Sequence, residues 1–275
     1  MHRRLRQFRY TLLSAMLCLV VAPLSAAQDA VCTQVRVAGP ESYPPFVWYN
    51  EPGPEVDGVG VSFVRRALEG MDIKVTSVKT SSWNRSLARG AAGEIDVLTA
   101  LYKTDERSET MHFIGPYGAE RTAVVSRAAL GLEISHLRQL EGLYGGAAQG
   151  DSRGDFVEGE LKNLNVIRAP HVRLLFAMLK AERLDYILVG EFSGLVRRDF
   201  NILEDPALKV DVLEEPTEGV YLAISRRSPC FETIRGHLEK RVILAKTSGR
   251  LEEMKREALA RFRAGQEPAP PASKP

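Results

Sequence analysis

The chain has few residues of the kinds that build catalytic and metal sites. Its 275 residues include three cysteines, two tryptophans and five histidines. The histidines beyond residue 27 lie at 112, 136, 171 and 237, which is not a metal-ligand spacing. The sequence also lacks a Gly-x-Ser-x-Gly nucleophile motif and a phosphate-binding Gly-Lys loop. We therefore expect no metal, no organic cofactor and no enzymatic activity.

Long apolar runs are also scarce, and the one that is present lies near the start of the chain. Residues 12–24 are apolar, follow four arginines within residues 3–9, and precede the small residues 25–27. This order is typical of a signal peptide, and the apolar run is too short to cross a bilayer comfortably. We expect cleavage after residue 27 and export to the periplasm. The alternative is an uncleaved N-terminal anchor.

The charge of the chain has no strong bias. The sequence holds 37 basic and 35 acidic residues, and removal of residues 1–27 takes away four arginines and no acid. The remaining 33 basic and 35 acidic residues leave a net charge of −2. Nucleic-acid binding needs a basic surface, so we expect no nucleic-acid partner.

Two cysteines, Cys32 and Cys230, remain after the expected cleavage. An even number of cysteines in an oxidising compartment favours a disulfide. The alternative is a pair of unpaired thiols, one of them near a frayed N-terminus.

Strand patterns alternate with helix patterns along most of the chain. The strands are expected at 34–38, 73–78, 95–101, 122–126, 143–148, 166–169, 186–189 and 208–213, and helices at 59–71, 82–89, 135–140, 154–161, 171–183 and 193–200. This alternation predicts an α/β fold with parallel-rich sheets flanked by helices on both faces. A return strand at 220–225 and a helical tail at 231–262, broken near Gly249, should rejoin the first part. The Pro- and Ala-rich residues 264–275 should be disordered.

The segment 94–121 carries most of the functional information. An apolar strand at 95–101 runs into a Thr-x-x-Arg motif at 104–107, and an aromatic strand with a Gly-Pro-Tyr turn at 115–117 follows. A guanidinium at the end of a strand, next to free backbone N–H groups, can bind a carboxylate in bidentate fashion. Arg107 is therefore a candidate carboxylate-binding residue.

The order of several motifs resembles one protein family. Gly-x-x-Asp at 93–96, Thr-x-x-Arg at 104–107 and Phe-x-x-Pro-Tyr at 113–117 occur in the order found in bacterial periplasmic solute-binding proteins of family three, the polar-amino-acid type. The aromatic segment 42–46 and Gln-Gly-Asp-Ser at 149–152 extend the resemblance, which covers about residues 35–262.

The resemblance implies a two-lobed periplasmic-binding-protein fold with a ligand in the cleft. Lobe one is expected at 33–126 and 220–262, and lobe two at 130–215, with two hinge crossings near 126–131 and 214–219. Such a protein is expected to be a monomer that delivers a small-molecule solute, an amino acid or an analogue, to the membrane permease of an ABC importer.

The resemblance also assigns roles to individual residues. Tyr43 matches an aromatic that packs against the ligand, Arg107 the clamp for its carboxylate, and Ser152 a hydroxyl of the second lobe. Trp83 is a candidate for the floor of the cleft. The alternatives are ordinary packing for Tyr43 and Trp83, and a solvated turn arginine for Arg107. Asp151 is expected to be an N-cap.

Two departures from the family pattern concern the ligand. The aspartate that takes the α-ammonium group in the family falls on Gly190 here, and Glu191, one residue later, is a substitute or only a helix-start acid. Ala100, Leu101 and Tyr102 lie where well-known amino-acid binders have serines. The sequence therefore predicts that the ligand carries an anionic group, but it does not identify the ligand's side chain.

Two other functions are alternatives. The same lobes occur in sensors that signal to a membrane receptor. Some relatives of this fold are periplasmic dehydratases of prephenate-like acids, in which case Glu191 or Asp151 would act as the acid.

Overall fold

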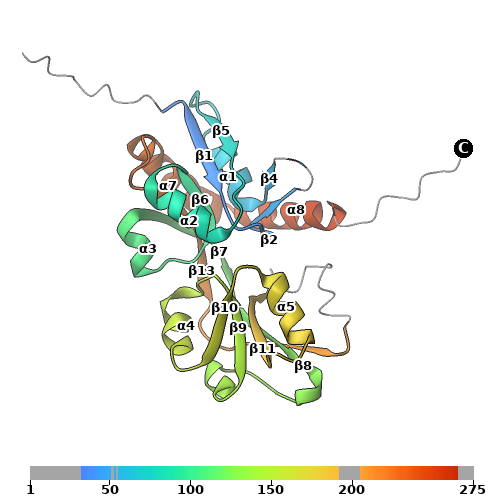
Figure 1. Cartoon of the computed structure of the whole chain (residues 1–275). Helices are drawn as coiled ribbons and strands as arrows, with labels where there is room; N and C mark the ends of the chain where they lie inside the picture. Colours follow the sequence, from blue (N-terminus) through green and yellow to red (C-terminus); the bar gives the residue numbers. More distant parts are fainter. Residues whose placement is uncertain (1–31, 51–52, 54, 192–204, 266–275) are drawn as a thin grey trace, which may run out of the picture. The chain divides into compact units, whose positions relative to one another are not determined.

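The computed structural model describes residues 32–50, 53, 55–191 and 205–265 (Figure 1). The expected signal peptide, the helix expected at 193–200 and the tail beyond Gly265 lie outside these residues. Residues 264 and 265, which were assigned to the tail, belong to the last helix instead. Among the described residues, none of the helices combines the length and the apolar character that a bilayer crossing requires.

Five strands form the first sheet, in the order β5-β1-β6-β13-β7 (Figure 1). Strand β1 pairs in parallel with β5 and β6, whereas β13 runs antiparallel to β6 and β7. The expected return strand is thus the fourth strand of this sheet. The bounds are Gln34–Ala38 (β1), Lys74–Ser77 (β5), Val97–Leu101 (β6), Met111–Glu120 (β7) and Glu218–Ser225 (β13).

The prediction of a turn at residues 115–117 is wrong, because these residues lie inside strand β7. Pro116 cannot donate a ladder hydrogen bond, but β7 is an edge strand, where proline is tolerated. The pairing of β7 with β13 shifts register between Val220 and Leu222.

Five further strands form the second sheet, in the order β10-β9-β11-β8-β12. Strand β9 pairs in parallel with β10 and β11, and β8 runs antiparallel to β11 and β12. Strand β8 was assigned from the sequence to lobe one, and this assignment is wrong because its pairing partners belong to the second sheet. The bounds are Thr122–Arg127 (β8), Tyr144–Ala148 (β9), Asn165–Ala169 (β10), Tyr186–Gly190 (β11) and Leu208–Val212 (β12).

The chain consequently passes from the first sheet to the second between Glu120 and Thr122, and returns between Val212 and Glu218. The expected second crossing at 214–219 overlaps this return. The first crossing lies before β8, not at 126–131 as expected. Residues 128–130 form the short 3-10 turn η1 (Ala128–Leu130).

Alternate residues of the first sheet pack into different apolar clusters, so helices cover both faces. Val97 belongs to a cluster with residues of α1 (Val59–Ala67), α7 (Phe231–Thr247) and α8 (Arg250–Gly265). Its neighbour Leu98 packs with residues of α2 (Trp83–Ala92). The cluster around α1 includes Phe262, whose ring lies 5.2 Å from that of Trp48. The helical tail therefore packs on the first sheet.

The ends of α2 follow from local chemistry. The Ser82 side chain accepts a hydrogen bond from the Arg85 N–H at the N-terminus, and serine is a preferred residue at this position. Gly93 ends the helix with φ 83°, a left-handed conformation that glycine adopts without strain. The break between α7 and α8 falls at Ser248 and Gly249, next to the expected position.

The second sheet is built on the same principle. Val125, Ile187 and Val189 pack with residues of α5 (Val172–Lys180). On the other face, Val124 and Leu188 pack with α4 (Gly154–Leu161) and η2 (Leu137–Leu140), beside the strands in Figure 1. The helix expected at 135–140 is thus a 3-10 turn. Three short strands, β2 (Ser42–Tyr43), β3 (Val47–Tyr49) and β4 (Val56–Asp57), form a separate small sheet.

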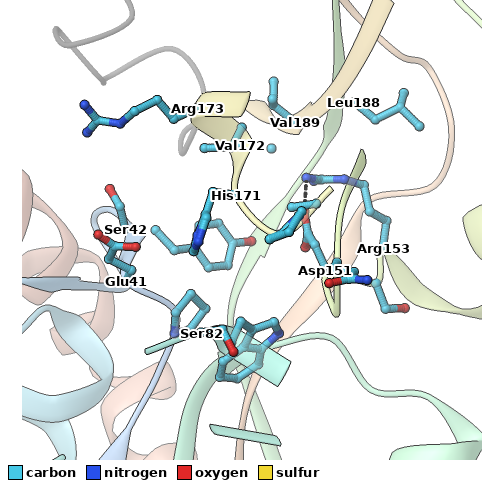
Figure 2. A pocket seen from close by; sticks show the side chains of 18 of the residues that line it. Glu41, Ser42, Ser82, Asp151, Arg153, His171, Val172, Arg173, Leu188 and Val189 are labelled. Atoms are coloured by element: carbon cyan, nitrogen blue, oxygen red, sulfur yellow. Dashed lines mark hydrogen bonds and ion pairs between the residues drawn. The ribbon is translucent and has the colours of Figure 1, made fainter. Parts of the chain in front are cut away.

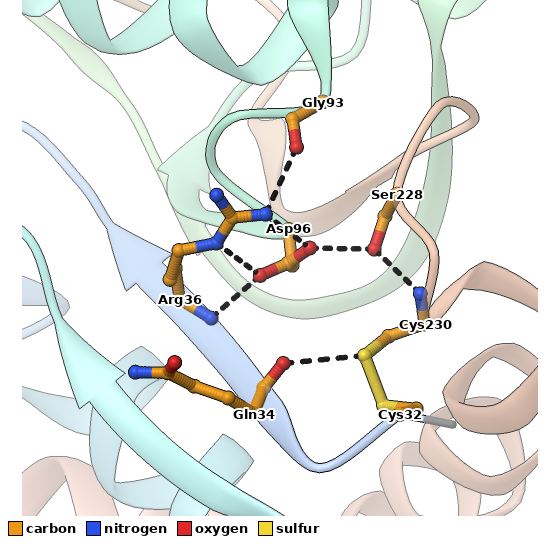
Figure 3. Close-up of a disulfide and its surroundings, with 7 residues drawn as sticks. All are labelled: Cys32, Gln34, Arg36, Gly93, Asp96, Ser228 and Cys230. Carbon is orange, nitrogen blue, oxygen red and sulfur yellow. Dashed lines mark hydrogen bonds and ion pairs between the residues drawn. A yellow bond between two sulfur atoms is a disulfide. The ribbon is translucent and has the colours of Figure 1, made fainter. Parts of the chain in front are cut away.

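Cys32 and Cys230 form a disulfide (Figure 3). Their Cα atoms lie 4.9 Å apart although 198 positions separate them in the sequence. Of the two alternatives for these cysteines, the bridged pair is the one in the structure. The bond links the start of β1 to the start of α7.

A buried carboxylate beside the disulfide ties the same elements together (Figure 3). Asp96 is fully buried and accepts hydrogen bonds from the backbone N–H and the guanidinium of Arg36, at 2.8–3.0 Å. It also accepts one from the Ser228 hydroxyl at 2.7 Å. The Ser228 oxygen in turn accepts the N–H of Cys230 at 3.0 Å. The buried charge is therefore paired and hydrogen-bonded, as it must be to be tolerated.

Candidate functional site

A cavity of about 710 Å³ lies where loops from the two sheets meet. This volume is typical of a small-molecule site. The loops follow the carboxyl ends of β1, β6, β9, β10 and β11, which is where doubly wound sheets bind ligands. The described lining residues come from 40–43, 82–83, 100–107, 148–153, 170–177 and 188–190.

Four of the five ligand-binding residues expected from the sequence line this cavity, namely Tyr43, Trp83, Arg107 and Ser152. Glu191 is not among the described lining residues. Its carboxylate accepts two hydrogen bonds from the Arg121 guanidinium, at 2.7 and 3.0 Å. Glu191 follows the last residue of β11, and its partner Arg121 lies 70 positions away in the chain. The expected contact of Glu191 with the ligand stays a prediction.

The position of Arg107 follows from the turn that contains it. Thr104 caps α3 (Asp105–Thr110) by accepting the Arg107 N–H at 3.2 Å. The Arg107 Nη1 donates to the Tyr102 carbonyl at 2.8 Å, and Nη2 donates to the Gly150 carbonyl at 2.9 Å. A guanidinium has five N–H donors, so three remain for other partners. Burial lowers the pKa of Arg107 from its ordinary value, although Asp151 and Glu158 oppose this.

The loop after β9 supplies polar atoms without partners. The Ser152 Oγ and the Arg153 Nε are buried, and neither has a hydrogen-bond partner among the described residues. Leaving a buried polar group unpaired costs about 1–3 kcal/mol, so such groups normally have a hydrogen-bond partner in the protein or in bound water. Both residues line the cavity.

Asp151 pairs with Arg153 instead of capping a helix (Figure 2). Its Oδ2 accepts from the Arg153 Nη2 at 2.7 Å, and the N-cap of α4 is Arg153 itself, without a side-chain cap. The expected N-cap role of Asp151 is therefore wrong. Burial opposes the charge of Arg153, but the carboxylates of Asp151 and Glu120 raise its pKa above the ordinary value.

A chain of hydroxyl groups runs from the cavity to a buried carboxylate. The Tyr43 and Tyr102 hydroxyls lie 2.6 Å apart, and the Tyr102 hydroxyl donates to the Glu120 Oε2 at 3.1 Å. Both tyrosines line the cavity, and Glu120 is 2% exposed. Burial and then the charge of Glu120 raise the pKa of both tyrosines well above the usual value, so the hydroxyls stay protonated.

The rest of the described lining on the side of the second sheet combines apolar side chains with Gln149, His171 and Arg173. Val172, Leu188 and Val189 lie together in Figure 2, with Glu41 and Ser42 on another side of the cavity. Apolar walls with a few fixed polar groups are usual for small-molecule sites. Among the described residues, no three His, Cys, Asp or Glu side chains gather closely enough to hold a metal ion.

Sequence reasoning missed Tyr102, Glu120 and Arg153. Tyr102 was treated as a departure from the serines of amino-acid binders, and Arg153 follows the recognised Gln-Gly-Asp-Ser motif directly. Glu120 ends the ten-residue strand β7, and its burial could not be read from the sequence.

Comparisons with known proteins agree with this geometry. The sequence model of the family described as "Bacterial extracellular solute-binding proteins, family 3" matches residues 35–267. Among curated proteins, no sequence matches the chain.

Solved structures share the fold at low sequence identity. An amino acid ABC transporter substrate-binding protein from Streptococcus pneumoniae, bound to L-arginine, has a TM-score of 0.69 at 19% identity, covering 86% of this chain and 97% of that one. A mutant of the T. maritima arginine-binding protein has a TM-score of 0.68 at 17% identity, covering 83% and 96%. An ancestral arginine-binding protein bound to glutamine has a TM-score of 0.67 at 19% identity, covering 82% and 97%. The two-lobed α/β fold expected from the sequence is confirmed by these likenesses.

Proposed function

Because the chain belongs to the bacterial extracellular solute-binding proteins of family 3, we propose that it captures a small carboxylate-bearing solute, an amino acid or a close analogue, for an ABC importer. The observation that carries the proposal is the guanidinium of Arg107 in the wall of the 710 Å³ cavity, with the unpaired hydroxyl of Ser152 in the same wall.

The ligand carboxylate would lie between these two residues. Arg107 retains N–H donors after its bonds to the Tyr102 and Gly150 carbonyls, and a charged donor pair of this kind binds carboxylates strongly. The Ser152 hydroxyl would donate from the loop before α4. Burial of the site strengthens both interactions because water competes less there.

Ligand binding would close the protein by a hinge at two chain segments. We propose that residues 33–120 with 218–265 form one lobe and 122–213 the other, with the crossings at 120–122 and 212–218 as the hinge. A ligand that contacts Arg107 on one side and Ser152 on the other interacts more with the closed arrangement, and so favours it.

The partner would be a membrane permease, and the leader would direct the chain to the periplasm. Mature protein should then begin at or near Gln28 and appear in the periplasmic fraction. N-terminal sequencing of fractionated cells tests this, and an intact Met1 on membrane-bound protein would reject the cleavage.

A thermal-shift screen tests the binding function directly. The panel contains the twenty amino acids, simple organic acids and polyamines, beginning with L-arginine and L-glutamine because similar structures hold these ligands. A ligand at one hundred times its dissociation constant adds about 2.7 kcal/mol to the free energy of unfolding, which is readily seen. Recovery of the ligand unchanged, measured by NMR after prolonged incubation, would separate binding from catalysis. If no carboxylate in the panel shifts the melt, the proposal fails.

A further inference from the structure

A second cavity, of about 400 Å³, shares no described lining residue with the proposed solute site. Its walls come from the ends of α1 and α7 and from the start of α8. The floor is apolar and built from the core, since Phe63 and Met254 line the cavity and are each only 4% exposed. His237 of α7 donates a hydrogen bond to the carbonyl of Ala67 at the end of α1, at 2.7 Å, which fixes two of the walls.

Two consecutive aliphatic side chains lie exposed beside this cavity. Ile243 and Leu244 of α7 are 62% and 59% exposed, and Leu244 lines the cavity. Residues three and four apart are neighbours on a helix surface, so both side chains lie next to Lys240 and Thr247. An exposed apolar patch with a polar rim is typical of a contact with another protein or with a membrane.

The charges around this patch are positive. Residues 240–250 hold four lysines and arginines and no acid. Arg241 and Arg250 line the cavity, together with Arg66 of α1. Arg250 pairs with Glu253 and Glu257 of α8, whereas neither Arg66 nor Arg241 forms an ion pair with another residue that the structure describes. Two exposed guanidinium groups at the cavity are therefore available for an anionic partner.

This concentration of cations runs against the charge of the rest of the chain. Without residues 1–27 the chain has 33 basic and 35 acidic residues, and without residues 240–250 as well it has 29 and 35, a net charge of −6. A chain of that charge is repelled by an anionic membrane, whereas clustered lysine and arginine side chains are attracted to it. The charge distribution therefore favours one orientation, with the end of α7 towards the anionic surface.

We propose that Arg66, Lys240, Arg241, Ile243 and Leu244 form a basic-aliphatic surface that binds anionic phospholipid. Arginine forks suit phosphate oxygens, and the aliphatic side chains would enter the boundary between headgroups and acyl chains. The apolar cavity would take part of a lipid chain. A bilayer fits this surface because its phosphates lie directly above its acyl chains, as the cations here lie beside exposed aliphatic groups and an apolar cavity. This inference goes beyond the proposed solute binding, since it would hold the protein at a membrane.

The test is co-sedimentation with lipid vesicles. Mature protein from the periplasmic fraction is mixed with vesicles of phosphatidylcholine, with or without phosphatidylglycerol. We expect binding to vesicles that contain phosphatidylglycerol and at least about tenfold weaker binding to neutral vesicles, because each cation near an anionic surface adds about 1 kcal/mol. Added salt should weaken the binding, since it screens these charges.

The first pair of variants tests the cations. Arg66→Gln combined with Arg241→Gln should weaken binding to the anionic vesicles by about 25-fold, or about fivefold for each cation. The matched control is Arg138→Gln combined with Lys162→Gln, which removes two exposed cations near the second sheet and should leave binding unchanged. All four side chains are exposed, so thermal melts should stay close to that of the wild type.

The second pair tests the aliphatic side chains. Ile243→Ser combined with Leu244→Ser should weaken vesicle binding by about tenfold or more, because it removes the apolar area that enters the bilayer. The matched control is Tyr144→Ser combined with Ile167→Ser, at positions that are 65% and 43% exposed, and it should have no effect. This pair also separates lipid from free phosphate, since an anion site would not need Ile243 and Leu244.

Several results would overturn the inference. Binding to neither kind of vesicle, or equal binding to both, would show that the surface does not recognise anionic lipid. Equal losses in the test and control variants would show that no particular surface is used, and loss in the arginine variant alone would indicate a simple anion site. Calorimetry with the solute found in the thermal-shift screen should give the wild-type affinity in all four variants, so the failure of lipid binding and that of solute binding are seen separately.

Discussion

Arg107 donates a hydrogen bond to the backbone carbonyl of Gly150 at 2.9 Å, which joins the segment after β6 to the loop after β9. The same guanidinium bonds to the Tyr102 carbonyl and lines the cavity. The proposed ligand clamp is therefore also a direct contact between segments that extend from the two sheets. Loss of Arg107 should therefore lower the ligand affinity. It should also remove a hydrogen bond that holds these two segments together.

Replacement of Arg107 by alanine should weaken ligand binding by about 2–4 kcal/mol, or about 30- to 1000-fold, because it leaves the carboxylate of the ligand without its charged partner in a partly buried site. Arg107→Lys should recover part of the loss, since an ammonium cannot reproduce the planar fork. Calorimetry with the ligand found in the screen measures both effects.

The matched control for Arg107 is Lys103→Ala, which removes an exposed cation four residues earlier. It should leave affinity unchanged. Unchanged affinity in Arg107→Ala, together with a normal thermal melt, would show that the carboxylate clamp is absent.

Removal of the Cys32–Cys230 disulfide should lower the free energy of unfolding by about 2–5 kcal/mol, because the bond closes a long loop in the unfolded chain. Urea unfolding of the mature protein with and without dithiothreitol measures the loss. The double variant Cys32→Ala, Cys230→Ala should be unstable to the same degree and insensitive to the reductant. Equal unfolding free energies for oxidised and reduced wild-type protein, or a count of two free thiols without reductant, would contradict the bond.

Replacement of Asp96 by alanine should destabilise the protein by about 3–5 kcal/mol, since it leaves the hydrogen-bonding groups of Arg36 and Ser228 without their buried partner. Equilibrium unfolding in urea measures this. Glu94→Ala removes a more exposed acid that pairs with Arg89, and should cost less than about 1 kcal/mol. Similar losses of unfolding free energy in the two variants would show that the buried network stabilises the protein no more than an exposed ion pair does.

The pair of Asp57 with Arg261 should make stability depend on pH. Partial burial pushes the pKa of Asp57 upwards, but hydrogen bonds from Arg261 and the Gly58 N–H outweigh this, so the pKa lies below its ordinary value. A folded-state pKa below the unfolded one adds stability above the unfolded pKa of about 3.9, and this stability is lost as the pH falls through the folded pKa.

Asp57→Asn should therefore lower the melting temperature at pH 7, and the difference from wild type should shrink below about pH 3.9. Calorimetric melts across this range provide the measurement. Asp72→Asn, at an exposed aspartate, is the control and should show no such difference. A deficit in Asp57→Asn that stays constant down to the lowest pH would mean that packing, and not the charge, explains the effect.

Much of the site could be predicted because local sequence determines local structure. Ser82 and Gly93 bound helix α2 through capping and a left-handed turn, and Thr104 fixes the turn that presents Arg107. These features depend on neighbours within a few residues, so the sequence motif carries them. Glu191 is not among the described lining residues, and its partner Arg121 lies 70 positions away in the chain, so no local motif indicates this pair.

The sequence by itself determined the α/β alternation, the order of motifs that identifies the family, and the positions of Tyr43, Trp83, Arg107 and Ser152 in the cavity wall. Only the tertiary structure decided that β8 joins the second sheet, that Asp151 pairs with Arg153, and that the buried Glu120 carboxylate accepts the Tyr102 hydroxyl. Each of these depends on strand pairing or contact between residues distant in the chain. The energy of such contacts comes from burial and partner geometry, and no local pattern of residues specifies which distant groups will meet.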